Sequence, residues 1–553
     1  MSIYGIDLGT TYSAISFVDD FGQTQIIPNS DNERITPSVV FFEESTNRVL
    51  VGTIAKELAI TDPDRVVSFI KREMSNDDYA FPIDDKEYTP AEISSLILKG
   101  LVGDVAAAGH EVRDVVITCP AYFGASERER TRQAGVLAGL NVIEILDEPV
   151  AAAIHYGQKN NCKGINAIVY DLGGGTFDVT VVKFGDNPEK NEISVICTEG
   201  NHQLGGKDWD DKIMEFYAQE LLTQKGKDIF TNLEAVYELR INAERDKQSL
   251  SRIGNVNRRV DFEGESVVVT LTREKFEDLT KGLMESTLVL TDNVIEQAKS
   301  RGVEHIDMYL LVGGSTRMSQ VKRKLAERYH LTDENLVMFE VDEAVAKGAA
   351  RAGTIEIMKV MLERMAQENY DKPYQSLTSA EQKHVMDIVA GVTGRTSTDI
   401  RDITMTNMVK VATKSYGIRI KNEDDSYSIH NLITKQTQVP MKESQVFGTA
   451  GPNSTLLILE PFMNNEPGVN AEVEKSILLG QAEFPLNGTL PERAPIEVTF
   501  ELDNQGLLKL TALDQTNNES ITASFKSNGV MSEVEMTRAM ENLQHLTVVR
   551  NDE

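Results

Sequence analysis

The sequence is poor in cysteine and in positive charge. It holds three cysteines among 553 residues, none of them in a Cys-x-x-Cys pair. This argues against a disulfide framework or a structural zinc site, and it fits a reducing compartment. Lysine and arginine number 56 against 86 aspartates and glutamates, a formal net charge of −30. Non-specific binding to nucleic acid or to an anionic membrane needs clustered positive charge, so we expect neither partner.

Long apolar runs are also missing. No run approaches the ~20 residues that cross a bilayer, and the amino terminus lacks the basic region and apolar core of a signal peptide. Apolar residues still make up 41% of the chain, which is enough for several cores, and the length suggests about two to four domains. We therefore expect a soluble, cytoplasmic, multidomain protein.

The first 353 residues alternate short strand-like runs with longer helical patterns, which predicts α/β layers in this domain. Residues 354–402 continue as a helical pattern followed by a polar stretch. We expect a connecting region there, with a packing helix over 354–366 and a solvated tether over 393–402. Capping boxes predict that helices begin at Ser126 and Thr378.

From residue 403 the helical pattern disappears. Strand-like runs recur over 403–530, and Asp503-Asn-Gln-Gly506 is a hairpin signal between two of them. This predicts an antiparallel β-sandwich. The remaining segment, 531–553, is expected to be a short tail with at most one helix.

One motif occurs twice in the α/β part: a strand that ends in aspartate, followed by glycine, threonine and a second strand. The copies are Asp7-Leu-Gly9-Thr10-Thr11 and Asp171-Leu-Gly173-Gly174-Gly175-Thr176-Phe-Asp178. Glycine allows close backbone approach and positive φ, and successive N–H groups form an anion-binding concavity suited to phosphates. The aspartates can hold Mg²⁺ through water. Two copies indicate an internal duplication, with related halves facing each other across a nucleotide.

A third motif, Gly313-Gly314-Ser315-Thr316-Arg317, follows an apolar strand-like run. The double glycine suits close approach to a nucleoside, and Arg317 is able to stack on a base. Together the three motifs resemble those of the actin-like ATPases and, within them, the 70-kDa heat-shock chaperones of the DnaK type. The resemblance covers nearly all of residues 1–353. It includes Ile70-Lys71-Arg72, Pro120-Ala-Tyr122-Phe, Asp147-Glu148-Pro-Val-Ala-Ala-Ala153 and Leu204-Gly205-Gly206.

The resemblance implies an ATPase with slow turnover, with ATP or ADP and Mg²⁺ as cofactors and K⁺ as a further cation. It implies catalytic roles for Lys71, Glu148, Thr176 and Asp171, and metal-organising roles for Asp7, Asp171 and Asp178. Pro120 and Arg128 match a switch that reports the γ-phosphate state. The implied nucleotide-binding residues are Gly9, Thr10, Thr11, Tyr12, Gly173, Gly174, Gly175, Thr176, Gly205, Gly206, Glu244, Lys247, Ser251, Gly313, Gly314, Ser315, Arg317 and Asp342.

The sequence departs from this family at several places. Lys207 replaces a glutamate near the nucleotide cleft, and the segment between Lys71 and Tyr88 is short. Glu144 stands where the family has a basic residue that docks J-domain cochaperones. We expect weak stimulation by such cochaperones, partly recovered by Glu144→Arg. The leucine-rich linker between the domains and the helical lid after the sandwich are both expected to be missing.

The sandwich region resembles the family's peptide-binding domain more weakly. Its alignment places five apolar side chains either in a peptide pocket or in the sandwich core, and the core is the better-supported position for each: Ile418, Ile420, Phe447, Leu457 and Leu459. A pocket would take an extended peptide along a sheet edge.

We interpret the chain as an atypical ATP-dependent chaperone that binds unfolded or extended polypeptides, with J-domain proteins and a nucleotide exchange factor as further partners. Two alternatives stay open at this point. One is a nucleotide-dependent adaptor or cochaperone that has lost client binding, and the other is a small-molecule kinase on the same fold.

Overall fold

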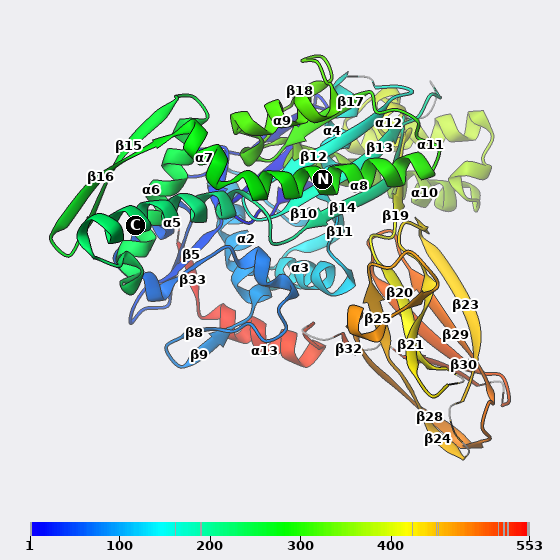
Figure 1. The fold of residues 1–553 in the computed structure, drawn as a ribbon. Helices are drawn as coiled ribbons and strands as arrows, with labels where there is room; N and C mark the ends of the chain where they lie inside the picture. Colours follow the sequence, from blue (N-terminus) through cyan, green and yellow to red (C-terminus); the bar gives the residue numbers. More distant parts are fainter. Residues whose placement is uncertain are drawn as a thin grey trace.

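The computed structural model describes residues 3–160, 162–187, 191–422, 424–449, 451, 453–517, 519–523, 526–527 and 530–549, so the last four residues of the expected tail lie outside it. Figure 1 shows an α/β part above and an elongated β-sandwich below, joined near the strand β19. No helix among the described residues has both the length and the apolar content needed to cross a membrane.

The α/β part contains two lobes, each built around a sheet that carries one copy of the repeated motif. In lobe I the strands follow the order β11, β10, β1, β2 and β3, with β4 beside β2. β1 is parallel to β10 and antiparallel to β2. The central strands are apolar on both faces because helices cover both sides of the sheet. The bounds are β1 Tyr4–Asp7, β2 Tyr12–Val18, β3 Thr24–Ile26, β4 Thr36–Pro37, β10 Asp114–Cys119 and β11 Asn141–Asp147.

Lobe II repeats this arrangement in the order β18, β17, β12, β13, β14, β19 and β22. The β12–β13 hairpin carries the second motif, and β17 leads into the third. The duplication predicted from the motifs is therefore present in the strand order. The bounds are β12 Asn166–Leu172, β13 Phe177–Phe184, β14 Asn191–Asn201, β17 Met308–Val312, β18 Leu336–Met338, β19 Thr406–Val411 and β22 Gln438–Val439.

Smaller elements complete each lobe. Lobe I adds a second sheet, β33-β6-β5-β7, and a hairpin, β8–β9. Lobe II adds the β15–β16 hairpin. The strands are β5 Val39–Phe42, β6 Arg48–Val51, β7 Val66–Ser68, β8 Phe81–Ile83, β9 Lys86–Tyr88, β15 Asn255–Phe262, β16 Glu265–Thr272 and β33 Thr547–Val549. The helices are α1 Thr53–Leu58, α2 Pro90–Ala107, α3 Ala125–Leu137, α4 Glu148–Asn160, α5 Gly206–Lys225, α6 Leu233–Leu250, α7 Arg273–Leu279, α8 Lys281–Ser300 and α9 Ser319–Tyr329.

The solvated tether expected over 393–402 is wrong. The long helix α10, Ala344–Tyr370, leads into α11, Ser379–Thr393, and α12, Ser397–Thr404. Ile400 and Ile403 of α12 are buried in the same core cluster as α4 and α10. These two apolar residues form the one buried face of α12. The other residues of the helix are mostly polar, so the sequence shows no clear apolar pattern there. The region 354–402 is thus packed on the ATPase lobes.

The two capping predictions have opposite outcomes. Thr378 caps α11 as predicted, since its hydroxyl accepts from the Glu381 amide and Glu381 bonds back to Thr378. The box at Ser126 is wrong, because α3 begins one residue earlier, at Ala125, with Gly124 as the cap. Ser126 therefore lies inside the first turn.

The carboxy-terminal part is an antiparallel sandwich, as predicted. Its core includes Tyr416, Val498 and Phe500, and the predicted hairpin at Asp503–Gly506 joins β29 to β30. The sheets are β26-β21-β20-β25-β27, β23-β29-β30-β31 and β24-β28-β32. The strands are β20 Ser415–Lys421, β21 Tyr427–Ile433, β23 Met441–Gly448, β24 Ser454–Leu459, β25 Pro461–Asn464, β26 Asn470–Ala471, β27 Ile477–Leu478, β28 Gly480–Leu490, β29 Pro495–Leu502, β30 Leu508–Asp514, β31 Glu519–Ala523 and β32 Lys526–Ser527.

The segment after the sandwich returns to lobe I. Helix α13, Glu533–Gln544, buries Ala539 and Leu543 in the lobe I core, and β33 pairs in parallel with β6. Figure 1 shows α13 in red beneath α3 and beside β8. The tail therefore packs on the ATPase part, and α13 does not lie over the sandwich.

Candidate nucleotide site

The turns of the two repeated hairpins touch each other. A Cβ placed on Gly174 would lie 2.0 Å from Thr11 Oγ1, and one on Gly175 would lie 2.2 Å from Thr10 Cγ2. Glycine is required here by this close approach and not by positive φ, because the turn glycines of both motifs have ordinary φ values. The positive-φ expectation is therefore wrong for these turns, although it holds for Gly313, with φ 81°.

Three carboxyl groups belong to the strands of these hairpins, of which Asp171 and Asp178 are buried and Asp7 is partly exposed. Burial, with repulsion from Glu148, raises the pKa of Asp7 to about 7 and that of Asp178 to about 8. Burial and the same carboxylate also raise the pKa of Asp171 well above its usual value. Carboxyl groups held this way favour a cation. Among the described residues, no three or more His, Cys, Asp or Glu side chains lie close enough together to form a metal-binding group by themselves.

Lys71 and Glu148 form a buried ion pair beside these aspartates. Burial opposes the charge on the lysine, but Glu148 and Asp7 outweigh it, so the pKa of Lys71 is raised. Lys71 therefore stays a cation beside Glu148 and Asp7. The side chain of Thr176 is buried in the same region, and the hydroxyl of Thr10 is buried without a hydrogen-bond partner among the described residues.

Arg72, which follows Lys71 in lobe I, forms hydrogen bonds with residues of lobe II. Its Nε donates to the Gly175 carbonyl at 2.8 Å, and its terminal nitrogens bond to both carboxylate oxygens of Asp208. From the third motif, Ser315 Oγ donates to the Gly173 carbonyl at 2.9 Å. The three motifs thus meet at one place, as the sequence predicted.

Several residues expected on the nucleoside side are joined to one another by hydrogen bonds. Tyr12 donates to Glu244 at 3.1 Å, and Lys247 Nζ donates to the Gly206 carbonyl at 2.8 Å. Ser251 lies one turn beyond Lys247 and donates to its carbonyl. Arg317 forms an ion pair with Asp342, and the arginine side chain is half-exposed.

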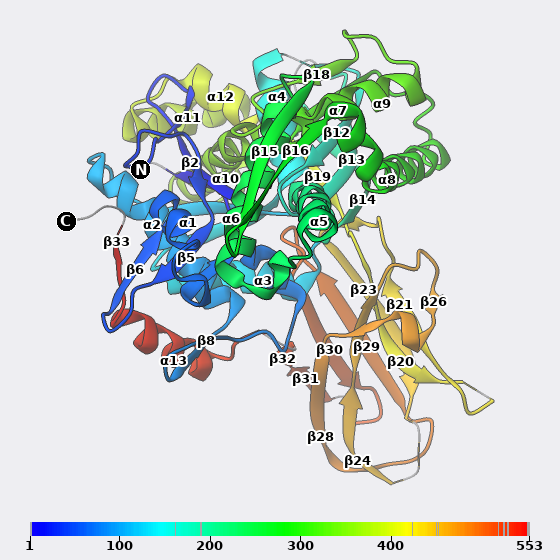
Figure 2. The same ribbon diagram turned by 60° about the vertical axis from the view of Figure 1, so that its left-hand side comes forward.

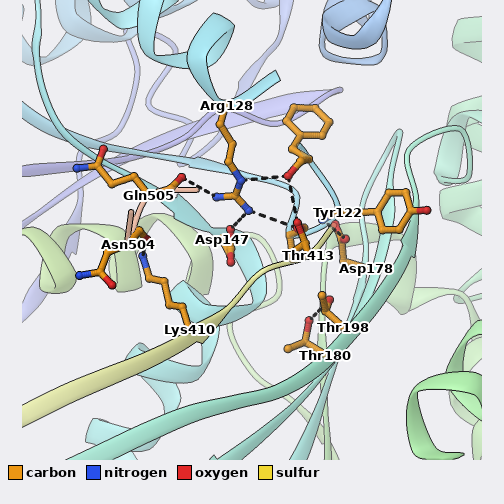
Figure 3. Close-up of polar contacts among 12 residues, drawn as sticks. Tyr122, Arg128, Asp147, Asp178, Thr180, Thr198, Lys410, Thr413, Asn504 and Gln505 are labelled. Atoms are coloured by element: carbon orange, nitrogen blue, oxygen red, sulfur yellow. Dashed lines mark hydrogen bonds and ion pairs between the residues drawn. The ribbon is translucent and has the colours of Figure 1, made fainter. Parts of the chain in front are cut away.

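A hydrogen-bond network leads from Asp178 to the sandwich (Figure 3). The Tyr122 amide donates to Asp178 Oδ1 at 3.2 Å, and the carbonyl of the next residue, Phe123, accepts from Arg128 and Thr413. Arg128 is also paired with Asp147 and donates to the Gln505 carbonyl in the β29–β30 turn.

The Glu144 side chain, which was expected to face a J-domain cochaperone, is buried inside the protein. It accepts from Lys410 Nζ at 2.5 Å, and Lys410 also donates to the Asn504 carbonyl. Lys410 lies on β19, which pairs in parallel with β14 of lobe II. β19 connects the α/β part to the sandwich, and its sequence, Thr406–Val411, contains no leucine.

Sequence reasoning missed several residues of the site. Lys56 of lobe I pairs with Glu244 of lobe II at 2.5 Å, and Asp210 pairs with Lys247 at 2.8 Å. Neither stands in a motif, so no sequence signal marked them. Arg72 stood in the recognised Ile-Lys-Arg motif, which could have revealed it.

The fold and the site define an actin-like ATPase joined to a β-sandwich. A family model described as Hsp70 protein matches residues 3–365 and 378–551. The chain is 34% identical over 549 residues to the chaperone protein DnaK of Thermotoga neapolitana, covering 98% of this chain and 83% of that protein. The chaperone protein DnaK of Thermosipho melanesiensis is 34% identical over 548 residues, with the same shares.

The chain belongs to the Hsp70 family. It is an ATP-dependent chaperone with ATPase activity, and it binds ATP and ADP. Its clients are unfolded polypeptides, and it works with cochaperones. The chaperone interpretation is confirmed, and the adaptor and kinase alternatives are not favoured.

Proposed function

We propose that the two hairpin turns hold the phosphates of Mg·ATP and that Lys71, Glu148 and Thr176 carry out its hydrolysis. The observation that carries this is the meeting of both turns beside three carboxyl groups and a buried lysine whose pKa is raised. Asp7, Asp171 and Asp178 would hold the hydrated Mg²⁺, which would supply charge neutralisation at the phosphates. K⁺ remains a prediction from the family resemblance.

Each side chain has a role that follows from its surroundings. Lys71 carries its charge next to the turns, where it stabilises negative charge on the transferred phosphoryl group. Glu148 holds the ammonium group in place and, with Thr176, offers oxygen atoms that orient a water molecule. Thr10 contributes a buried hydroxyl donor that has no partner among the described residues.

The nucleotide state is proposed to reach the sandwich through the network of Figure 3. A shift of Asp178 would move the Tyr122–Phe123 backbone, which Arg128 and Thr413 share. The Lys410–Glu144 pair would report the same movement through β19. Because both contacts bridge the domains, a change at the metal site alters how the sandwich is held.

For clients, we propose that the sandwich binds short apolar segments of extended polypeptides weakly and exchanges them rapidly. Of the five aligned side chains, Ile418 and Leu459 are buried in the sandwich core, which supports core roles for these two. The other three, Ile420, Phe447 and Leu457, are only partly buried against that core. Peptide affinity measured in the apo, ADP and ATP states tests this part. Equal affinity in all three states, or dissociation over minutes, would contradict it.

Hydrolysis is tested by single-turnover measurement on Lys71→Ala. We expect the rate to fall about a hundredfold or more while ATP still binds, because a cation is lost where charge develops. Lys159→Ala serves as the matched control, since Lys159 is a half-exposed surface lysine paired with Glu340. A wild-type rate for Lys71→Ala would refute the assignment.

A further inference from the structure

Phe69 has an unusual backbone conformation directly before the catalytic segment. Its φ is 62°, in the left-handed region, and the 3₁₀ helix with Lys71 and Arg72 begins at the next residue. An aromatic residue is rare in this region, and such a conformation persists only where the surroundings hold it. The contacts of the ring show what holds it.

Two cations from the opposite lobe lie over the Phe69 ring. Lys207 Nζ is 5.5 Å from the ring centroid, and the guanidinium carbon of Arg240 is 5.7 Å from it. Lys207 is on α5 and Arg240 on α6, both in lobe II, whereas Phe69 belongs to lobe I. Cations at these distances are attracted to the ring face. Asp211 pairs with both cations, at 2.5 and 3.9 Å, and keeps them side by side.

Further contacts join lobe II to lobe I beside the Phe69 ring. The Arg240 guanidinium also lies 5.5 Å from the Tyr237 ring, and Tyr237 packs against an apolar cluster of lobe I. Figure 2 shows α6 beside α1 and β5 of lobe I. The Lys207 amide donates to the Gly174 carbonyl at 2.8 Å, so the lysine is anchored on the phosphate turn itself.

We propose that Phe69, Lys207 and Arg240 form a cation–π clamp that holds the lobes closed and sets the rate of nucleotide dissociation. This rests on the nucleotide lying between the two hairpin turns. A nucleotide held there leaves only when the lobes separate, and separation must break both cation–ring contacts. Lys71 is held independently by Glu148, so the clamp controls nucleotide residence and not the hydrolytic step.

The test is the dissociation of a fluorescent ADP analogue from the full chain, measured by stopped-flow displacement with unlabelled ADP. Phe69→Leu keeps an apolar side chain but removes the ring. Each cation–π contact at a partly exposed position is worth about a two- to fivefold change, so we expect dissociation about four- to twenty-fivefold faster. Lys207→Met should accelerate it about two- to fivefold. In the double variant, ADP should dissociate at most about twofold faster than in Phe69→Leu, because both substitutions remove the same contact.

The molecule offers a matched control in Phe216→Leu. Lys275 Nζ lies 5.2 Å from the Phe216 ring, but both residues belong to lobe II, so this contact does not cross the cleft. Its loss should leave ADP dissociation unchanged. Single-turnover hydrolysis at saturating ATP should stay within twofold of wild type in Phe69→Leu.

Three results would overturn the clamp: unchanged ADP dissociation in Phe69→Leu, equal acceleration in Phe216→Leu, or slowed hydrolysis without faster release. Failure of the wild-type chain to bind labelled ADP would instead contradict the nucleotide site, so the two proposals fail in distinguishable ways.

Discussion

The ATPase lobes and the sandwich differ in where they bury charge. The lobes bury many charged side chains, each beside a partner or in the site, such as Lys71, Arg128 and Asp171. Within the described part of residues 405–549, only four charged side chains are buried, and three of them are the lysines Lys410, Lys414 and Lys435.

These three lysines all face carboxylates of the lobes. Lys410 pairs with Glu144, Lys435 pairs with Glu199 at 2.8 Å, and Lys414 is attracted to Glu127. Buried charged side chains are thus found throughout the lobes, including the proposed site. In the described part of the sandwich region they lie mainly where the sandwich meets the lobes. Substitutions of charge should therefore change catalysis in the lobes and docking in the sandwich.

The largest expected effect is in the lobes, for Asp7→Lys. It places a second cation beside Lys71 where Mg²⁺ is proposed to bind, and like charges at such contacts cost several kcal/mol. We expect the affinity for Mg·ADP to fall at least about a hundredfold. Titration calorimetry with and without Mg²⁺ measures this, with circular dichroism to confirm folding. Asp514→Asn, at the end of β30 in the sandwich, is the control and should leave the affinity unchanged.

The sequence predicted the site in the lobes better than the interface between the lobes and the sandwich. The hairpins with Asp7 and Asp171 could be predicted because strand, aspartate, glycine and threonine stand next to one another and occur twice. The interface could not, because Lys410 and Glu144 are 266 positions apart and neither belongs to a local motif. Likewise, α12 was taken for a tether, since only Ile400 and Ile403 mark its buried face.

The second effect is at the interface, where Lys410→Glu places a carboxylate against the carboxylate of Glu144. Breaking a buried ion pair by removing one partner costs about 3–5 kcal/mol. We expect β19 to separate from β14 and its amides to lose protection in hydrogen exchange. Glu144→Arg should do the same by opposing Lys410, and this replaces the earlier expectation that it recovers cochaperone stimulation.

The double variant Glu144→Lys/Lys410→Glu reverses both charges and keeps the pair. It should recover most of the protection lost in Lys410→Glu. If Lys410→Glu alone leaves β19 protected, the pair does not hold the docked state.

The third effect lies within the sandwich and compares two neighbours on β23. Phe447 is half-buried against the core and the His430 ring, whereas Val446 is 50% exposed. Phe447→Asp should destabilise the sandwich by about 2–4 kcal/mol, because it places a charge among apolar side chains. Val446→Asp should stay within about 0.5 kcal/mol of wild type. Denaturant unfolding measures both, and equal stability would show that Phe447 does not pack in the core.

The smallest effect is a pH dependence of docking through Lys414. Burial in the docked interface lowers the pKa of Lys414 to about 7, a shift that Lys435 reinforces and that Glu127, Glu199 and Asp178 oppose. Its ammonium nitrogen lies 3.2 Å from the centroid of the Tyr122 ring. Undocked and hydrated, a lysine has a pKa of about 10.4.

Between about pH 7 and pH 10 the undocked form therefore binds the extra proton, and docking releases it. Docking should strengthen as the pH rises from 7 to 9, by at most about tenfold per unit, and this contribution should vanish below pH 7. Glu127 acts in the opposite sense, because burial raises its pKa and its protonation favours docking as the pH falls. Energy transfer between dyes on the two domains measures docking. Lys414→Met should remove the rise between pH 7 and 9, and a rise that persists in this variant would show that another group is responsible.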